Sequence, residues 1–447
     1  METNAGQLKR SLKLWHVVVI GIAYMSPFAV FDTFGIVSDV TNGHVPTAYL
    51  LVFAAILFTA FSYGKMVRIY PISGSVYTYT QRTINPHLGF IVGWVTFLSY
   101  LALPMINALL AQIYLSAGFP NVPAWMWTVG LMIVITVGNI IGMKIAASVN
   151  MLFVVFQILV GIIFIILTIS STIGNEPDRF MTLDPIFSSD MEVSALFAGA
   201  AILALAFIGF DAITTLSEET VNPKKTIPKA VFLVAFFGGA FFFTVTYFMQ
   251  SLFPDVSQFS DIEGASPEIA AFIGGNLFLA LFLAGALISV FASGMAAQAS
   301  ASRLLYAMGR DGTLPRRFFG YVHPRFHTPV LNIVLIGVLA LSALLLDLES
   351  ATALINFGAF AAFTFVNLCV IIHFTKAGEV RSVRSIINHI ISPLIGIGFL
   401  IYFWASLDLF SVTVGVIWTV VGVVYLMLKT NFFKKEPPQV DFEELEG

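Results

Sequence analysis

Charged residues are scarce in this sequence. Asp, Glu, Lys and Arg make up 11% of its 447 residues, whereas globular proteins average roughly 25%. A soluble chain of this length could not cover its surface with so few charges, and disordered or coiled-coil proteins need more of them. The single cysteine excludes a disulfide scaffold. The net charge of −3 offers no basic surface to a nucleic acid.

Apolar residues are abundant instead. They make up 58% of the chain, Phe alone occurs 44 times, and the mean hydropathy is +0.91. About 20 apolar residues in a helix cross a bilayer. Runs such as VVFQILVGIIFIILTI (154–169) lack the alternation of membrane β-strands. The sequence therefore predicts an all-α membrane protein with twelve transmembrane helices, at residues 14–40, 46–64, 86–117, 124–143, 147–173, 193–217, 228–253, 269–304, 328–346, 350–374, 387–407 and 410–428.

The basic residues support this count. With the N-terminus placed inside, 21 of the 22 basic residues fall on the inner side and only Arg179 falls outside. Cytoplasmic loops are enriched in Lys and Arg, so both termini are predicted to be cytoplasmic. Thirteen of the 25 acidic residues fall on the outer side. They either fill the side that basic residues avoid or form a field that concentrates cations.

Two of the expected helices contain signals for a break. The first contains GIAYMSPF, in which Ser26 and Pro27 favour the start of a new half-helix, and the sixth contains AFIGFD, in which Gly209 precedes an acid. These helices are five spans apart and cross the membrane in opposite senses, as inverted repeats require. Two ordinary kinked helices are the alternative.

Two acids, Asp32 and Asp211, fall within the expected membrane helices. A charge there is costly and points to a function. Asp211 is predicted to cap the second half of the sixth helix, to receive a substrate ammonium, or to do both. Asp32 either binds a second ammonium or bonds to a neighbouring helix. Two acids in one pathway suit a molecule with two positive ends.

Other polar and aromatic residues are weaker candidates for a binding site. Tyr100 and Asn107 share one face of the third helix, and Phe207 and Phe210 flank Gly209, where they could stack on a cation or an alkyl chain. The sequence has no HExxH, P-loop, CxxC or G-x-S-x-G motif. An enzyme, a metal site and a cofactor are therefore not expected.

Several segments resemble the amino acid–polyamine–organocation transporters. GFDAITTLSEETVNPKKTIPKA (209–230) is similar to their sixth helix and following loop, and SRLLYAMGRDGTLPRRF (302–318) to their loop after helix eight. More narrowly, AYMSPFAVFDTFGIVS (23–38), LPMINALLAQIYLSA (103–117) and ATALINFGAFAAFTFVNL (351–368) resemble bacterial putrescine importers.

The resemblance implies a LeuT-like fold with five-plus-five inverted repeats, at about 14–173 and 193–374, and two extra helices at about 387–428. Residues 1–13 would be a cytoplasmic segment, 14–429 one transporter domain, and 430–447 a disordered cytoplasmic tail. The protein would lie in a bacterial inner membrane. The substrate would contact residues from helices 1, 3, 6, 8 and 10, namely Ala23, Tyr24, Met25, Ser26, Tyr100, Asn107, Phe207, Ile208, Gly209, Phe210, Asp211, Ser289 and Phe357. Asp32 joins this predicted site as the second acid within the membrane helices.

The function implied is import of putrescine or a related diamine by alternating access, with H⁺ as the coupling ion. A cytoplasmic gate would pair Lys65 or Arg68 with Glu218 or Glu219. The fifth helix lacks the Lys that replaces a sodium ion in some relatives, which removes the simplest candidate for a proton-coupling group and leaves the coupling ion open. An amino-acid symporter or exchanger on the same fold is the alternative, and a transporter-like sensor or channel is a third possibility.

Overall fold

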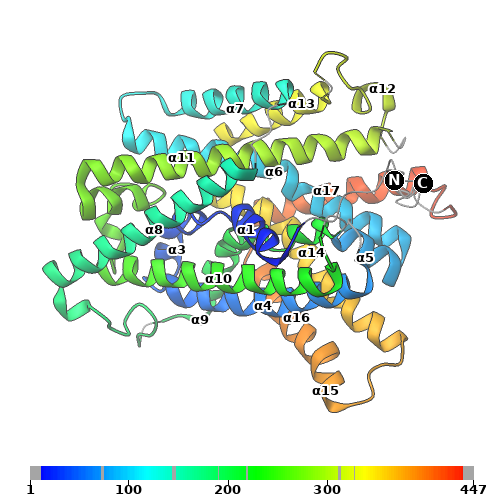
Figure 1. Cartoon of the computed structure of the whole chain (residues 1–447), viewed down its shortest axis with the longest axis horizontal. Helices are drawn as coiled ribbons and strands as arrows, with labels where there is room; N and C mark the ends of the chain where they lie inside the picture. Colours follow the sequence, from blue (N-terminus) through cyan, green and yellow to red (C-terminus); the bar gives the residue numbers. More distant parts are fainter. Residues whose placement is uncertain are drawn as a thin grey trace.

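The computed structural model describes residues 12–71, 75–142, 147–189, 191–217, 220–310, 314–326 and 328–435. Within these ranges the chain is helical, and its one β-bridge joins Leu12 to Thr220. The long helices run mostly along the long axis of the molecule (Figure 1). The α-helices are α1 (Leu14–Met25), α2 (Ala29–Asp32), α3 (Phe34–Val40), α4 (Val45–Ile69), α5 (Ser75–Thr83), α6 (Pro86–Gly118), α7 (Ala124–Ile141), α8 (Ala147–Asn175), α9 (Val193–Leu203), α10 (Pro223–Leu252), α11 (Ala265–Arg310), α12 (Arg316–Phe319), α13 (Val330–Ala340), α14 (Leu348–Lys376), α15 (Val383–Ile386), α16 (Ser392–Ala405) and α17 (Leu409–Lys429).

Short 3₁₀ segments join some of these helices. They are η1 (Pro177–Arg179), η2 (Ala204–Phe207), η3 (Ala212–Leu216), η4 (Val256–Gln258) and η5 (Leu341–Leu345), while η6 (Ile387–Ile391) is a π-helical turn. Among the described residues, eleven helical segments are long and apolar enough to cross a membrane. The expected span 328–346 is shorter, because its apolar helix covers Val330–Leu345 and ends in 3₁₀ geometry. The prediction of a multi-pass, all-helical membrane protein is confirmed.

Local sequence signals mark where several helices begin. The side chains of Asn85, Asp347 and Asp408 accept hydrogen bonds from backbone amides in the first turns of α6, α14 and α17. Such caps satisfy amides that have no partner inside the helix. Proline lies in the first turns of α4, α6 and α10, where its missing N–H costs nothing.

We define the terminal end as the end of the molecule at which α17 ends and near which the labels of α5 and α12 lie (Figure 1). There the amide of Val221 donates to the carbonyl of Leu12 at 2.9 Å, and His87 Nε2 donates to the carbonyl of Lys435 at 3.0 Å. The loop that contains Arg179 and the start of α17 lie away from this end. Residues 1–11 and 436–447 lie outside the described residues. They belong to the expected N-terminal segment and to the expected C-terminal tail.

The helical backbone is interrupted at two places that touch each other. α1 ends at Met25, Ser26 has φ 52°, and the chain becomes helical again at α2. Between η2 and η3 the chain is extended at Ile208, and Gly209 has φ 117°. A Cβ atom on Gly209 would lie 2.9 Å from the carbonyl carbon of Tyr24. The backbones of the two interruptions are therefore in direct contact, and glycine makes that contact possible.

Candidate functional site

A cavity of about 920 Å³ lies beside both interruptions. It is lined by residues of α1, α2, α6, α7, α8, α11, α13 and α14 and by the segment from η2 to η3. The lining extends from Asp32 of α2 to three residues far from it along the chain. These are Gly142, which directly follows α7, Tyr306 of α11, and Thr328, which precedes α13. A volume of this size lies within the range of about 300–1,000 Å³ that small-molecule sites have, so the cavity is the candidate binding site.

Hydrogen bonds from Ser26 hold the end of α1 against two other helices. Ser26 Oγ donates to Gln157 Oε1 of α8 at 2.9 Å. The same oxygen lies 2.6 Å from Ser289 Oγ of α11. The three side chains line the cavity. These side-chain bonds tie the residue at the interruption to α8 and to α11, so the cluster fixes the interruption against both helices.

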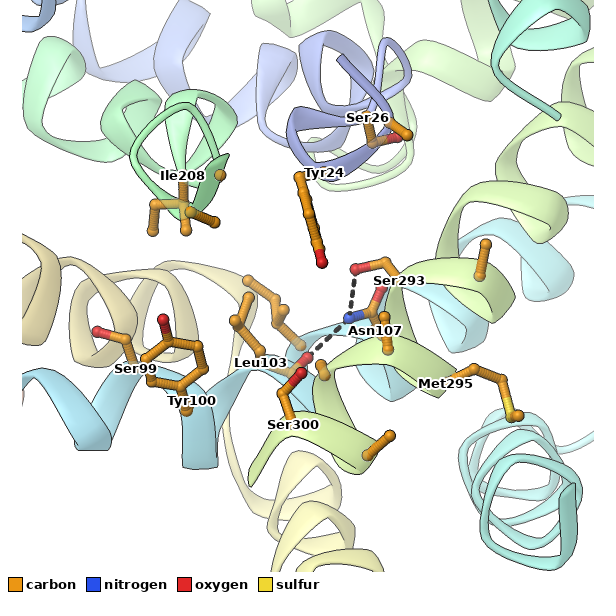
Figure 2. Close-up of a pocket in the computed structure, with 18 of the residues that line it drawn as sticks. Tyr24, Ser26, Ser99, Tyr100, Leu103, Asn107, Ile208, Ser293, Met295 and Ser300 are labelled. Carbon is orange, nitrogen blue, oxygen red and sulfur yellow. Dashed lines mark hydrogen bonds between the residues drawn. The ribbon is translucent and has the colours of Figure 1, made fainter. Parts of the chain in front are cut away.

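Aromatic and amide side chains form the middle of the cavity. Tyr24 is 47% exposed although it lies in a membrane-spanning segment, because its ring projects into the cavity toward Ser293 and Asn107 (Figure 2). Asn107 Nδ2 donates to the carbonyl of Leu103 at 2.8 Å and to Ser293 Oγ at 3.1 Å. Tyr100 lines the same wall, one turn before Leu103. This surface offers both a ring face and polar atoms to a ligand.

The two carboxylates of the cavity each accept a bond from a tyrosine of another helix. Tyr63 Oη of α4 donates to Asp211 Oδ2 at 3.4 Å, and Tyr114 Oη of α6 donates to Asp32 Oδ1 at 2.5 Å. Within the described residues the only ion pair joins Arg179 to Glu176, so neither carboxylate is paired with a basic side chain. Two carboxylates facing one cavity inside a membrane are suited to a cationic ligand.

Comparison with known proteins assigns the family. The profile of the amino acid permease family matches residues 16–434. The chain belongs to this family. The permease is 45% identical to the low-affinity putrescine importer PlaP of Escherichia coli K12, over 98% of both chains. It is 26% identical to the branched-chain amino acid permease BcaP of Bacillus subtilis, over 96% of this chain and 94% of the relative. It is 27% identical to the methylthioribose transporter of Bacillus subtilis, over 96% and 95%. The predicted membership of the amino acid–polyamine–organocation superfamily is confirmed.

Most of the residues predicted for the site line the central cavity of the permease. They are Ala23, Tyr24, Met25, Ser26, Asp32, Tyr100, Asn107, Ile208, Gly209, Asp211 and Ser289. They come from positions up to 266 residues apart and meet because the two interruptions face α6 and α11.

Three predicted phenylalanines do not line this cavity. Phe207 packs against Tyr49 and Phe242, with its ring centroid 5.4 Å from that of Phe242. Phe210 packs edge-to-face on Tyr63. Phe357 packs on Trp404, 4.7 Å away between centroids. The extended turn around Gly209 directs the rings of Phe207 and Phe210 into the core, and both are fully buried.

The expected gate is described only in part. Lys65 Nζ donates to the carbonyl of Asn388 in η6, and Arg68 is exposed. Neither lines the central cavity. Glu218 and Glu219 lie outside the described residues, so the proposed pairing stays a prediction.

Sequence reasoning missed several residues of the site. Gln157 is a polar residue within the highly apolar segment Met151–Asn175, which was the available signal, since a polar group in a membrane needs a partner. Ser293 lies four residues after Ser289 on the same face of α11. Tyr63 and Tyr114 carry no signal of their own, because only the tertiary fold brings their hydroxyls to Asp211 and Asp32.

Proposed function

We propose that this permease imports putrescine or a related diamine across a bacterial inner membrane. The observation that carries the proposal is the pair of carboxylates, Asp32 and Asp211, that face one cavity without a basic partner among the described residues. The relative with 45% identity is a putrescine importer. A dication brings two positive charges, so two carboxylates complement it without leaving a buried charge unpaired.

The binding mode follows from the positions of the polar groups. One ammonium binds Asp211 beside the hydroxyl of Tyr63, and the other binds toward Asp32. The methylene chain between them lies along the ring of Tyr24, which projects into the cavity (Figure 2). Tyr100 and Asn107 complete the wall opposite the interruptions. Aromatic faces attract ammonium groups and also bury alkyl surface.

The transport cycle that we propose is alternating access, with the present structure open toward the terminal end. The cavity reaches Gly142, Tyr306 and Thr328 at that end. Phe31 of α2 and Phe282 of α11, by contrast, are fully buried and pack edge-to-face with ring centroids 5.0 Å apart, and the ring of Phe164 lies 4.8 Å from that of Phe31. None of the three rings lines the cavity, and we take this aromatic cluster beside Asp32 as the closed side in the proposed cycle. We take the terminal end as the cytoplasmic side, because α17 ends there and the distribution of basic residues in the sequence predicts a cytoplasmic C-terminus.

The wider architecture is part of the same proposal. We take the interruptions after α1 and after η2 as the broken helices of two inverted repeats, at about 14–173 and 193–374, followed by two extra helices at about 387–428. Segment Val330–Leu345 then serves as the ninth of twelve spans. Rocking of one repeat-derived bundle against the rest would close the terminal end and open the other.

Cation entry is driven by the membrane potential, which contributes about 2.3 kcal/mol per charge per 100 mV. We propose H⁺ as an additional coupling ion. The cytoplasmic gate remains Lys65 or Arg68 with Glu218 or Glu219. Putrescine uptake into liposomes with an imposed pH gradient and zero membrane potential tests the coupling. An uptake rate that does not change with the gradient would exclude H⁺ as a coupling ion.

Radiolabelled putrescine uptake by the purified permease in liposomes tests the function. Charge-assisted hydrogen bonds contribute about 1.5–3 kcal/mol each, so Asp211→Asn should lower kcat/KM for uptake at least about tenfold. Asp255→Asn is the matched control, because Asp255 is an exposed acid outside the membrane-spanning segments. Uptake that Asp211→Asn leaves unchanged would remove Asp211 from the site.

An amino-acid carrier or exchanger is the second candidate. It is favoured by the relative BcaP, named as a branched-chain amino acid permease, which aligns over 96% of this chain. A competition panel separates the candidates, because diamines should block putrescine uptake and neutral amino acids should not. Block by neutral amino acids together with their own uptake would favour the second candidate.

A further inference from the structure

A short chain of hydrogen bonds crosses the first helix interruption. Ser26 follows α1, Gln157 belongs to α8 and Ser289 belongs to α11, and all three side chains line the central cavity. Ser26 Oγ donates to Gln157 Oε1 at 2.9 Å and lies 2.6 Å from Ser289 Oγ. Gln157 is 4% exposed and Ser289 is 8% exposed, so protein atoms surround both residues except where they line the cavity. We call these three residues the relay.

The hydrogen bonds of the relay run in one direction. A serine hydroxyl carries one hydrogen, and an amide oxygen only accepts. Ser26 gives its hydrogen to Gln157 Oε1, so the bond between the two serines must use the hydrogen of Ser289. Ser289 therefore donates to Ser26, and Ser26 donates to Gln157. The amide oxygen at the end of the relay sets this order.

The order determines what Ser289 offers to the cavity. Its hydrogen is directed to Ser26, and its oxygen makes no second hydrogen bond within the part of the chain that the structure describes. The lone pairs of Ser289 Oγ therefore remain as acceptors. Since Ser289 lines the cavity, a ligand meets an acceptor at this position. In the reverse order, the same hydroxyl would present its hydrogen instead.

Other polar groups of the cavity have the same polarity. Both hydrogens of Asn107 Nδ2 are used, by the carbonyl of Leu103 and by Ser293 Oγ, so its Oδ1 is left as an acceptor. The tyrosine hydroxyls beside Asp211 and Asp32 donate to those carboxylates. An ammonium group has three N–H donors and no acceptor, so it matches such a surface, whereas a carboxylate has only acceptors.

We propose that Gln157 is a specificity-determining residue of the permease. It directs the hydrogen of Ser289 away from the cavity and thereby favours ligands that end in an ammonium group over ligands that end in a carboxylate. Gln157 acts through Ser26 and Ser289, so it is a positioning residue. The inference rests on the proposed function, import of a diamine, and adds how the same site excludes a zwitterion of equal length.

The amide oxygen of Gln157 is the group on which this selection depends. Without it, Ser26 donates to Ser289 instead, because the two hydroxyl oxygens already lie 2.6 Å apart. The hydrogen of Ser289 then turns toward the cavity, where it opposes an N–H donor and binds a carboxylate.

Ligand binding to the purified full-length permease tests this proposal. The two probes are putrescine and γ-aminobutyrate, which has the same number of carbon atoms but carries a carboxylate in place of one ammonium group. The rise in unfolding temperature with each ligand gives its half-saturating concentration. The ratio of the two concentrations measures the preference for putrescine. Putrescine uptake in liposomes gives KM and kcat for the same variants.

Gln157→Met retains the length of the side chain but removes the acceptor. We expect the preference for putrescine to fall about tenfold or more, because a hydrogen bond to a charged group changes binding by at least that factor. KM for putrescine should rise while kcat changes less, since the relay acts on binding. Gln157→Glu provides an acceptor at the same position and should retain the preference for putrescine.

Gln112→Met is the matched control. Gln112 Oε1 of α6 also accepts a hydroxyl, that of Thr128 at 2.7 Å, but Gln112 does not line the central cavity. This variant loses the same kind of bond and should keep the wild-type preference. Ser289→Ala removes the far end of the relay with a small change in volume, so it tests the proposal even if Gln157→Met does not fold. It should also lose the preference, and the double variant should lose little more, because both changes act through one oxygen.

A lost preference in Gln157→Met and Ser289→Ala, with a retained preference in Gln157→Glu and Gln112→Met, supports the proposal. A preference that survives in Gln157→Met, or in Ser289→Ala where Gln157→Met does not fold, would overturn it and leave the proposed function intact. Equal losses in Gln157→Met and Gln112→Met would show a general loss of helix packing and would also overturn it. A wild-type permease that binds γ-aminobutyrate as tightly as putrescine would overturn both this inference and the diamine assignment.

Discussion

Replacement of Gly209 by alanine tests the central geometric claim, that the two helix interruptions touch. Gly209 has φ 117°, a conformation that residues with a side chain rarely adopt. A Cβ atom there would lie 2.9 Å from the carbonyl carbon of Tyr24 and 3.0 Å from the amide nitrogen of Met25. These atoms are backbone, so they cannot rotate away as the end of a flexible side chain could.

Gly209→Ala should lower the free energy of unfolding in two ways, by backbone strain and by a steric clash. Substitutions at two other glycines measure these two contributions separately. Gly275 also has positive φ, 61°, but a Cβ there meets nothing within 4 Å, whereas Gly130 has neither strain nor a neighbour. Backbone strain of this kind costs about 1–3 kcal/mol, so Gly275→Ala should destabilise by that amount. Gly130→Ala should not destabilise. Gly209→Ala should exceed Gly275→Ala, because the contact forces the end of α1 to move.

Thermal unfolding and putrescine uptake in liposomes measure the two effects. We expect Gly209→Ala to lower both the unfolding temperature and the uptake rate, and Gly275→Ala to lower mainly the unfolding temperature, since Gly275 does not line the central cavity. If Gly209→Ala behaved like Gly130→Ala in both assays, the interruptions could not be in contact as described, and the reasoning would be refuted.

Three further substitutions test contacts between helices, each read by thermal unfolding. Tyr114→Phe removes the hydroxyl that donates to Asp32 and should cost about 1.5–3 kcal/mol; an unchanged unfolding temperature would argue against the bond. Trp94→Phe removes the bond from Trp94 Nε1 to the carbonyl of Trp418 at 2.9 Å and part of the indole that stacks on the Trp418 ring. We expect a loss of at least about 1 kcal/mol, and an unchanged unfolding temperature would contradict this contact. Gly415→Val places a Cβ 2.4 Å from an aromatic ring of α14. The free energy of unfolding should fall by about 1–3 kcal/mol or more. An unchanged unfolding temperature would show that α14 and α17 are not packed this closely.

The apolar runs alone determined much of the fold of the protein. Long apolar segments must be helical in a membrane, because a helix satisfies its own backbone polar groups. For that reason eleven of the expected spans coincide with helices long enough to cross. Gly209 could also be singled out from sequence, since glycine next to an acid within an apolar run is unusual.

Only the tertiary structure decided which side chains meet. Phe207 and Phe210 were expected in the site, yet the turn at Gly209 directs both rings into the core. Gln157 was not expected, yet it bonds to Ser26 across 131 positions of the sequence. In a chain that is apolar on nearly every helix face, composition does not show which face meets a cavity, a neighbour or lipid. That choice depends on how the helices pack against one another, and packing is set by long-range contacts that no local pattern encodes.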